Sequence, residues 1–215
     1  MTAEGGERVD PLNTRDITDP RELRALSHPV RLALLEVLAV EGALTATQAG
    51  ELIGESPTTC SFHFRQLAKY GFVEEAGGGT GRNRPWRRVN LGINFPETSV
   101  DAETAVAAET LAGLFYSRMF ARFDQWRRVK HSYPLEWREA ATVSEWATYL
   151  TPAELGALAG ELRSLMGRYA ERLVDPSLRP EGSRLVEVLT AGYPVEFARV
   201  AADVPSDEAG EMGGA

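Results

Sequence analysis

The segment 44–89 constrains the fold of this chain more than any other, because its capping and turn residues follow one another at short intervals. Thr45-Ala46-Thr47-Gln48 has the spacing of a capping box, which predicts a short helix that ends at Gly54. Ser56-Pro57 is typical of a helix N-terminus, and Gly71 marks the end of that second helix. The segment therefore predicts two short helices separated by a tight turn.

Two extended runs follow these helices. Residues 72–76 (Phe-Val-Glu-Glu-Ala) and 86–91 (Trp-Arg-Arg-Val-Asn-Leu) have the composition of paired strands. The loop between them, residues 77–85, is rich in glycine and carries arginines that could reach a phosphate backbone or a minor groove. Helix, turn, helix and hairpin in this order form the ground plan of a winged helix-turn-helix, so the first hypothesis is DNA binding.

The helix that Ser56 opens has two distinct sides. Cys60, Phe64 and Leu67 recur at helical spacing and should pack inward. The other side chains of this helix are mostly hydrogen-bonding or cationic, and the loop and second strand add arginines. The predicted DNA-contacting residues are Ser56, Thr58, Thr59, Ser61, Phe62, His63, Arg65, Gln66, Lys69, Arg82, Arg84 and Arg87.

The charge distribution permits this partner although the whole chain carries a formal net charge of -8. From Ser56 to Asn90 the chain is basic, with a net charge of +4. Local positive charge is what phosphate binding requires. The overall acidity leaves a second interpretation open, in which the winged helix is a protein-interaction module without sequence-specific DNA binding.

The same residues resemble a known family. Leu26-Ser27-His28-Pro29-Val30-Arg31-Leu32-Ala33-Leu34-Leu35, the helix 56–67, Gly71-Phe72-Val73, Gly81-Arg82 and Pro85-Trp86-Arg87 are similar to the ArsR-type winged-helix transcriptional regulators. The resemblance covers roughly residues 20–91. It implies a homodimer that reads a palindromic operator with the second helix in the major groove and the wing on the backbone. Repression by promoter occlusion is the expected outcome.

Phe62 departs from the family pattern, which Ser61, His63, Phe64 and Leu67 match. Many members of the family have arginine at the position of Phe62. An outward phenylalanine could contact a thymine methyl group, or it could pack on neighbouring helices. The resemblance leaves both alternatives open.

Metal sensing, which is common in the family, has few candidate ligands in this chain. A tight site for a borderline or soft cation takes about four ligands, whereas the chain has one cysteine and three histidines. We expect Cys60 to be a core residue and His28 to cap or pack the helix that Pro29 begins. No metal, no cofactor and no enzymatic activity is expected, because motifs for nucleotide binding, zinc proteolysis or a nucleophilic serine are missing.

The chain should divide into four parts. We expect a disordered tail over residues 1–18, a winged helix-turn-helix domain over 19–93, a C-terminal domain over 99–202, and a disordered acidic tail over 203–215. Asp19-Pro20-Arg21-Glu22 predicts a capping box and a first helix to about Ser27, and Pro29 predicts a second helix that ends at Gly42.

The C-terminal domain should serve dimerisation or sensing. Residues 101–130 predict a long helix that is apolar on several sides, so we expect it to form the dimer interface, the alternative being an intrachain core helix. A helix over 134–141, a strand over 142–150, a helix from Thr151 and a strand over 184–190 suggest a small α+β module. Its aromatic residues could line a pocket for a small apolar ligand or simply form core; the candidate pocket residues are Trp126, Tyr133, Trp137, Trp146 and Tyr149.

The expected fold class is thus mainly α with small β elements, a winged helix-turn-helix followed by a helical or α+β domain. A single cysteine and the absence of an apolar N-terminal run favour a soluble, cytoplasmic protein. No segment is long and apolar enough to span a membrane. The expected partners are double-stranded DNA and a second copy of the chain.

Overall fold

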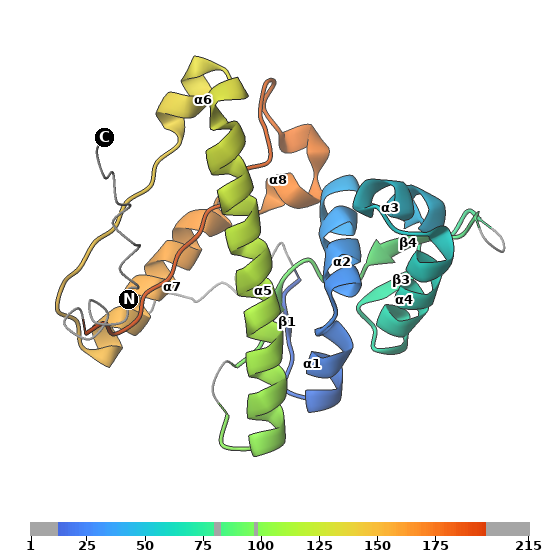
Figure 1. The fold of residues 1–215 in the computed structure, drawn as a ribbon, viewed down its shortest axis with the longest axis horizontal. Helices are drawn as coiled ribbons and strands as arrows, with labels where there is room; N and C mark the ends of the chain where they lie inside the picture. The colour runs from blue at the N-terminus through green and yellow to red at the C-terminus, as the bar shows by residue number, and fades with distance from the viewer. Residues whose placement is uncertain (1–12, 80–82, 97–98, 197–215) are drawn as a thin grey trace, which may run out of the picture. The chain divides into compact units, whose positions relative to one another are not determined.

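The computed structural model describes residues 13–79, 83–96 and 99–196, most of them in helices or in connections between helices (Figure 1). The chain divides into two compact units. The first runs to Ala147 and includes Gly167–Arg179, and the second comprises Thr148–Met166 and the residues after Arg179. The predicted fold class, mainly α with small β elements, is confirmed.

The first unit opens with helix α1 (Pro20–Leu26). Its N-cap is Asp19, whose carboxylate accepts a hydrogen bond from a backbone amide of the first turn at 2.7 Å. Glu22 does not complete the predicted capping box. It forms an ion pair with Arg15 at 2.7 Å instead, because the chain before α1 lies beside the helix and brings a guanidinium within reach.

Helix α2 (Pro29–Glu41) follows after a short break. His28 is its N-cap, with Nδ1 accepting a hydrogen bond from the backbone amide of Val30 at 3.2 Å. The predicted capping role of His28 is therefore confirmed. The helix ends at Gly42, whose φ of +80° suits glycine.

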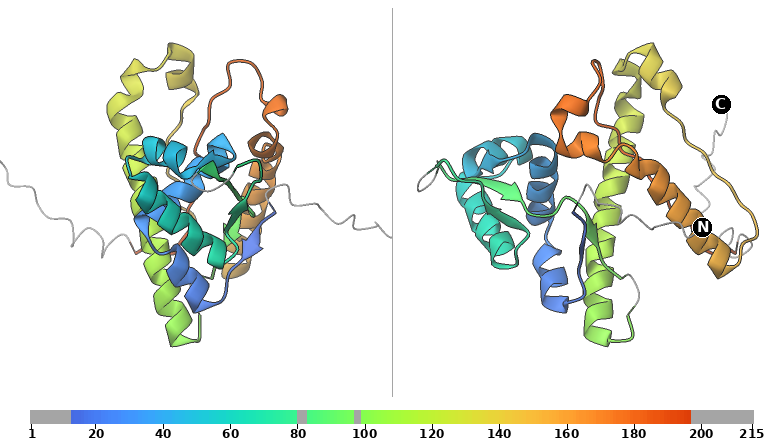
Figure 2. Two further views of the ribbon diagram at one scale, coloured as in Figure 1. Left: turned by 90° about the vertical axis from the view of Figure 1, so that its right-hand side faces the viewer. Right: turned by 180° about the vertical axis from the view of Figure 1, so that it is seen from behind.

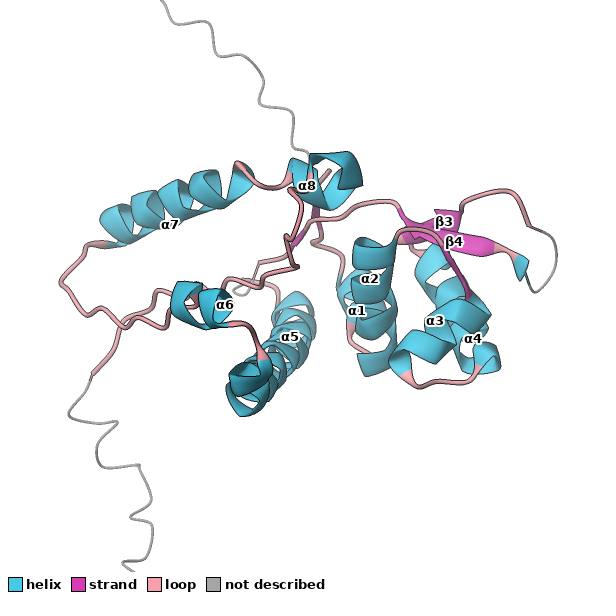
Figure 3. Cartoon of the chain, turned by 90° about the horizontal axis from the view of Figure 1, so that it is seen from above, coloured by secondary structure: helices cyan, strands magenta, loops and turns pink. Residues whose placement is uncertain are grey.

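Helices α3 (Ala46–Ile53) and α4 (Pro57–Lys69) have the ends that the sequence predicts. Thr45 and Gln48 form the capping box of α3, which ends at Gly54 in the left-handed conformation. Ser56 caps α4 by accepting a hydrogen bond from the backbone amide three residues on, at 3.0 Å. In Figure 3, α1 and α2 lie between α5 on one side and α3 and α4 on the other.

A small antiparallel sheet lies beside these helices. Its strand order is β2 (Leu44–Thr45), β4 (Pro85–Arg88), β3 (Val73–Glu75). Glu74 lies opposite Arg87 across the β3–β4 hairpin, and Leu44 lies opposite Trp86. The two predicted strands are thus present, shorter than expected, and β2 joins them as a third strand that the sequence reasoning missed.

A second, parallel pairing corrects the predicted N-terminal tail. β1 (Arg15–Asp16) pairs with β5 (Ile93–Asn94), and Ile17 is only 1% exposed. The expectation of disorder through residue 18 is therefore wrong for residues 13–18. Residues 1–12 and 203–215, the remainder of the two predicted tails, lie outside the described residues.

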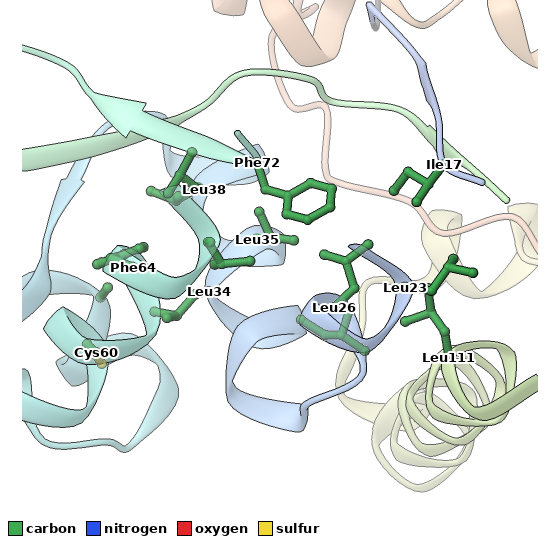
Figure 4. Packing of buried hydrophobic residues seen from close by; sticks show 14 of the residues in the cluster. Ile17, Leu23, Leu26, Leu34, Leu35, Leu38, Cys60, Phe64, Phe72 and Leu111 are labelled. Carbon is green, nitrogen blue, oxygen red and sulfur yellow. The ribbon is translucent and has the colours of Figure 1, made fainter. Parts of the chain in front are cut away.

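One hydrophobic core holds the first unit together (Figure 4). Side chains from α1, α2, α4 and β3 meet in it, and Phe64 stacks on Trp86 with ring centroids 5.6 Å apart. Cys60, Phe64 and Leu67 are each fully buried, as predicted. The largest fully buried side chains are Phe64, Ile17, Leu23, Leu26, Leu32, Leu34, Leu67, Leu111, Val73 and Cys60.

Helix α5 (Ala102–Val129) is the long helix that the sequence predicts and runs alongside α1 (Figures 1 and 2). Its first turns bury Ala107, Ala108 and Leu111 against that core. Further along, the Glu36 carboxylate of α2 binds Arg118 and Arg122. One side of α5 is thus fixed to the rest of the first unit by apolar contacts and then by ion pairs.

The region after α5 differs from the predicted α+β module. It contains η2 (Lys130–Ser132), α6 (Leu135–Ala140), α7 (Pro152–Gly167), α8 (Glu171–Val174) and η3 (Pro176–Leu178). The predicted strands 142–150 and 184–190 are wrong, because neither segment has a strand to pair with and both lack regular structure. The capping box of Thr151 and Glu154 is present and opens α7 in the second unit. Within the described residues, no helix has both the length and the apolarity needed to cross a membrane.

Candidate nucleic-acid interface

The turn between α3 and α4 holds the two helices close together. Glu55 N donates a hydrogen bond to Gly50 O at 3.0 Å. A Cβ atom on Gly50 would lie 2.5 Å from Glu55 O and 3.6 Å from Cys60 Sγ. Gly50 therefore allows the close approach of the turn to α3. The sequence reasoning missed it, although an isolated glycine within a helical pattern often has a packing reason.

The outer side of α4 is polar and basic. A helix advances about 100° per residue, so the side opposite the core carries Thr58, Phe62, Arg65 and Lys69, all of which are exposed. Ser61 accepts a hydrogen bond from Arg65 Nη1 at 2.9 Å. α4 contains two basic residues and no acidic one. This face therefore presents hydrogen-bonding groups together with positive charge, the combination that a DNA groove requires.

Three further predicted contacts lie at the ends and flanks of α4. Ser56 Oγ and Thr59 Oγ1 are 2.8 Å apart, and Ser56 Oγ also accepts from the Thr59 amide. Both hydroxyls thus take part in the helix cap. Gln66 is partly buried and faces a cavity next to α1 rather than the outer side of the helix.

His63 does not lie on the outer face of α4. It is 7% exposed, because residue 63 is three positions from Cys60 and four from Leu67, on the inward side of α4. Its ring centroid lies 4.4 Å from that of His28. Burial, followed by the charges of His28 and Arg31, lowers the pKa of His63 despite the opposing charge of a nearby glutamate. The His63 ring thus packs on the inner side of α4, and its contact with DNA stays a prediction.

Phe62 lies at the surface of α4, and its ring contacts the next residue of the same helix. Half of the side chain is exposed, at 50%. Its ring also meets the edge of His63, with centroids 5.1 Å apart and planes at 76°. Its contact with His63 orients Phe62, while its exposed half remains available to an apolar partner.

The arginines of the β3–β4 hairpin are already paired. Arg84 Nη1 lies 2.6 Å from Glu75 Oε1, and Arg87 Nη2 lies 2.7 Å from Glu74 Oε1. All four side chains are about half exposed, so solvent screens both pairs. Arg82, the third predicted contact of the loop, lies outside the described residues.

The geometry of α3, the turn and α4 agrees with a comparison to known protein families. A family model described as a helix-turn-helix domain matches residues 26–76. The chain carries a helix-turn-helix domain. The match extends from the last residue of α1 to the residue after β3. Such a domain supports the general assignment as a DNA-binding regulator. No curated protein matches the chain.

Outside the helix-turn-helix domain, the residues predicted to line an aromatic pocket differ in exposure. Trp146 and Tyr149 are 91% and 103% exposed, so protein does not enclose either side chain. Trp126 instead stacks on Phe123 at 5.8 Å and lies beneath the ammonium of Lys130. Tyr133 and Trp137 are only partly buried. Trp146 and Tyr149 lie in an exposed, irregular connection, and the apolar pocket stays a prediction.

The candidate metal ligands have other roles. Cys60 is buried, and burial raises the pKa of its thiol. His28 caps α2 and stacks on His63. Throughout residues 13–79, 83–96 and 99–196, His, Cys, Asp and Glu side chains nowhere gather in threes in a way that could hold a metal ion.

Proposed function

We propose that this protein is a sequence-specific transcriptional regulator of the ArsR type, a homodimeric repressor that reads a palindromic operator without sensing metal. The observation that carries the proposal is the outer face of α4, which is exposed, basic and free of acidic residues within the helix. The turn and caps around Gly50 and Ser56 hold this face in a fixed orientation. Rigid placement of the recognition helix is what base reading requires.

The contacts divide by chemistry. Thr58, Ser61 and Arg65 offer hydroxyl and guanidinium groups to base edges, and Phe62 offers an apolar surface that suits a thymine methyl group. Lys69 is the last residue of α4, and we assign its ammonium to the phosphate backbone. The hydrogen bond from Arg65 to Ser61 is exposed. Arg65 can therefore exchange Ser61 for a guanine base.

The β3–β4 hairpin is the proposed wing. Arg84 and Arg87 must exchange the carboxylates of Glu75 and Glu74 for phosphates before they contribute. Breaking each ion pair costs free energy that offsets part of the new phosphate contact. These arginines therefore contribute less to DNA affinity than Arg65. The two acidic residues also oppose the approach of any misplaced phosphate.

The proposed dimer uses the side of α5 that faces away from the core. The core-facing residues Ala108, Leu111 and Phe115 define one side of the helix, and about 100° per residue places Val106, Gly113 and Phe120 opposite them. Val106 is 65% exposed and Phe120 is 59% exposed. A Cβ on Gly113 would meet nothing within 4 Å. Val106, Gly113 and Phe120 are spaced by seven residues, as in paired helices.

DNA selection tests the proposal as a whole. Selection from a random duplex pool with the full chain should yield one inverted repeat. In Arg65→Gln, the slope of log affinity against log salt should fall by about 1 if Arg65 neutralises a phosphate, or specificity should relax at one base pair if it reads a base. Arg163→Gln on α7 is the matched control. Recovery of no enriched sequence would instead favour a winged-helix protein-interaction module.

Light scattering tests the dimer separately. The parent should have the mass of a dimer at micromolar concentration, and Phe120→Glu should shift it toward monomer because a carboxylate would be buried in the interface. Val143→Glu, in an exposed irregular segment, should leave the mass unchanged. A parent that is monomeric at micromolar concentration rejects the homodimer.

A further inference from the structure

A polar cavity lies among α1, α2 and α4, away from the outer face of α4. Its volume is about 220 Å³, and its lining residues are Arg21, Arg24, Ala25, Arg31, Gln66 and Tyr70. Residues three and four apart share one side of a helix. Arg21, Arg24 and Ala25 on α1, and Gln66 and Tyr70 on α4, meet that condition. Each helix thus presents one face to the same space.

The lining is strongly basic. Three of its six residues are arginines, and none is acidic. Arg24 has one acidic partner, Glu103, at 2.7 Å and at an exposed position. The ammonium of Lys69 lies over the ring of Tyr70 at 5.5 Å and adds a fourth positive charge nearby. A space lined in this way favours a negatively charged occupant.

Arg31 carries an unused donor. Its Nη2 donates to the backbone oxygen of Arg24 at 3.2 Å, but its Nε is buried and has no hydrogen-bond partner. A buried donor without a partner costs free energy. Burial also lowers the pKa of Arg31, outweighing the effect of Tyr70, so the charge lacks compensation where it lies.

We propose that this cavity is an oxyanion site that binds a phosphate group. The guanidiniums of Arg21 and Arg31 would supply charge-assisted hydrogen bonds, and the Gln66 amide and the Tyr70 hydroxyl would complete the donor set. The volume suits a phosphate with a small substituent. The phosphate can belong to a free small molecule or to the DNA backbone, and the chemistry of recognition is the same for both.

Binding here would bear on the proposed regulator. An anion bound among α1, α2 and α4 would connect the C-terminal turn of α4 to α1 and α2. Any difference in anion affinity between the free and DNA-bound states then couples the two ligands. That coupling rests on the proposed function, whereas anion binding itself does not.

Thermal unfolding of the full chain in inorganic phosphate is the first experiment, at constant ionic strength set with sodium chloride. The parent should show a saturable rise in Tm. Arg21→Gln should raise the half-saturating phosphate concentration at least tenfold, and the control Arg163→Gln should behave as the parent. Arg21 is exposed on α1, so the variant should fold. A rise that does not saturate, or that is equal in Arg21→Gln, is a general salt effect.

Operator binding by the same two variants identifies the source of the phosphate. If Arg21→Gln loses saturable phosphate binding but keeps the parent's salt slope on DNA, the ligand is a free anion. If it lowers that slope by about 1 and phosphate competes with DNA, the site holds a backbone phosphate. The oxyanion site is wrong if phosphate causes no saturable rise in the Tm of the parent and Arg21→Gln keeps the parent's salt slope on DNA. That result would not affect the proposal that α4 binds DNA.

Discussion

Two regions of this chain contain similar amounts of apolar side chain but use them differently. Every buried residue that the structure describes lies between residues 13 and 112, and none lies between residues 113 and 196. Leu111 on α5 is fully buried, whereas Leu158 and Leu165 on α7 are 43% and 47% exposed. The first region therefore supplies the hydrophobic stabilisation, whereas the apolar side chains of the second region stay partly or fully exposed.

The difference shows what makes an apolar helix part of a core. α4 and α7 both begin at a well-formed cap and carry apolar residues at helical spacing. α4 has α2, α3 and the sheet around it, while α7 buries none of its residues. Exposed apolar area of this extent is typical of surfaces that serve association. Local pattern forms the helix, and tertiary partners decide whether it is buried.

The largest expected effect tests this contrast directly. Leu111→Ala should lower the free energy of unfolding by about 2–5 kcal/mol, because it leaves a cavity where α5 meets α1. Leu165→Ala on α7 is the matched control and should cost less than about 1 kcal/mol, since much of its side chain already contacts water. Urea unfolding at low protein concentration measures both. Equal losses would break the comparison and show that α7 is covered in solution.

Glycine-to-alanine substitutions give a second contrast between the two regions, because their expected effects on stability have opposite signs. Gly50→Ala should destabilise by about 1–3 kcal/mol because its Cβ would meet Glu55 O at 2.5 Å, which requires the turn to shift. Gly156→Ala on α7 meets nothing within 4 Å and should stabilise by about 0.5–1 kcal/mol through helix propensity. Thermal unfolding of both variants reports the signs. Destabilisation by Gly156→Ala would show that α7 has a close neighbour in solution.

A pH dependence of stability near neutral pH should arise from two histidines in the packed region. Burial, with the charge of Arg31, lowers the pKa of His28, and burial lowers that of His63. As pH falls through the unfolded value of 6.5, the unfolded chain takes up protons first, so stability decreases toward acid and levels off below the folded pKa. His63→Phe should flatten this window in urea titrations, and His131→Phe, at an exposed position, should leave it intact. If stability depends on pH equally in His63→Phe and in the parent, groups other than His63 cause the pH dependence.

Sequence reasoning succeeded where neighbouring residues determine the structure. The caps at Thr45 and Ser56 and the stop at Gly54 depend on residues within four positions, and all three are confirmed. β1 and β5 are some 78 residues apart, as their Asp16–Asn94 contact shows, and nothing in either short segment indicates the other. The alternation in 142–150 suggested a strand, but a strand needs a neighbour to accept its hydrogen bonds.

His63 and the arginine cavity show the same limit at the candidate site. Helical spacing alone puts His63 beside Cys60 on the inner side of α4, and the family resemblance outweighed that signal. Arg21, Arg31 and Gln66 meet only after three helices pack, so no spacing in the sequence could bring them together. By contrast, the exposure of Arg65 and Lys69 follows from their positions on α4 and was predicted correctly.

The smallest expected effects on stability come from ion pairs on α5. This helix begins in the first region and ends in the second. Glu36 joins α2 to Arg118 and Arg122, whereas Asp124 pairs only within α5, with Arg127 and Arg128. Glu36→Gln should cost about 1 kcal/mol, because a partly buried network is disrupted. Asp124→Asn should cost roughly 0.3–0.5 kcal/mol, as for other pairs within one helix.

Acid titration tests the ion pairs of Glu36. Burial raises the pKa of Glu36, but the hydrogen bonds and charges of Arg118 and Arg122 outweigh it and lower the pKa below the ordinary 4.5. A lowered pKa stabilises the folded state above 4.5, and that stabilisation disappears as pH falls through the folded value. Urea unfolding between pH 5 and 3 should therefore show a shallower loss of stability in Glu36→Gln than in the parent. If Glu36→Gln follows the parent, the α2–α5 pairs do not persist in solution, and α5 is held to the rest of the first unit by its apolar turns alone.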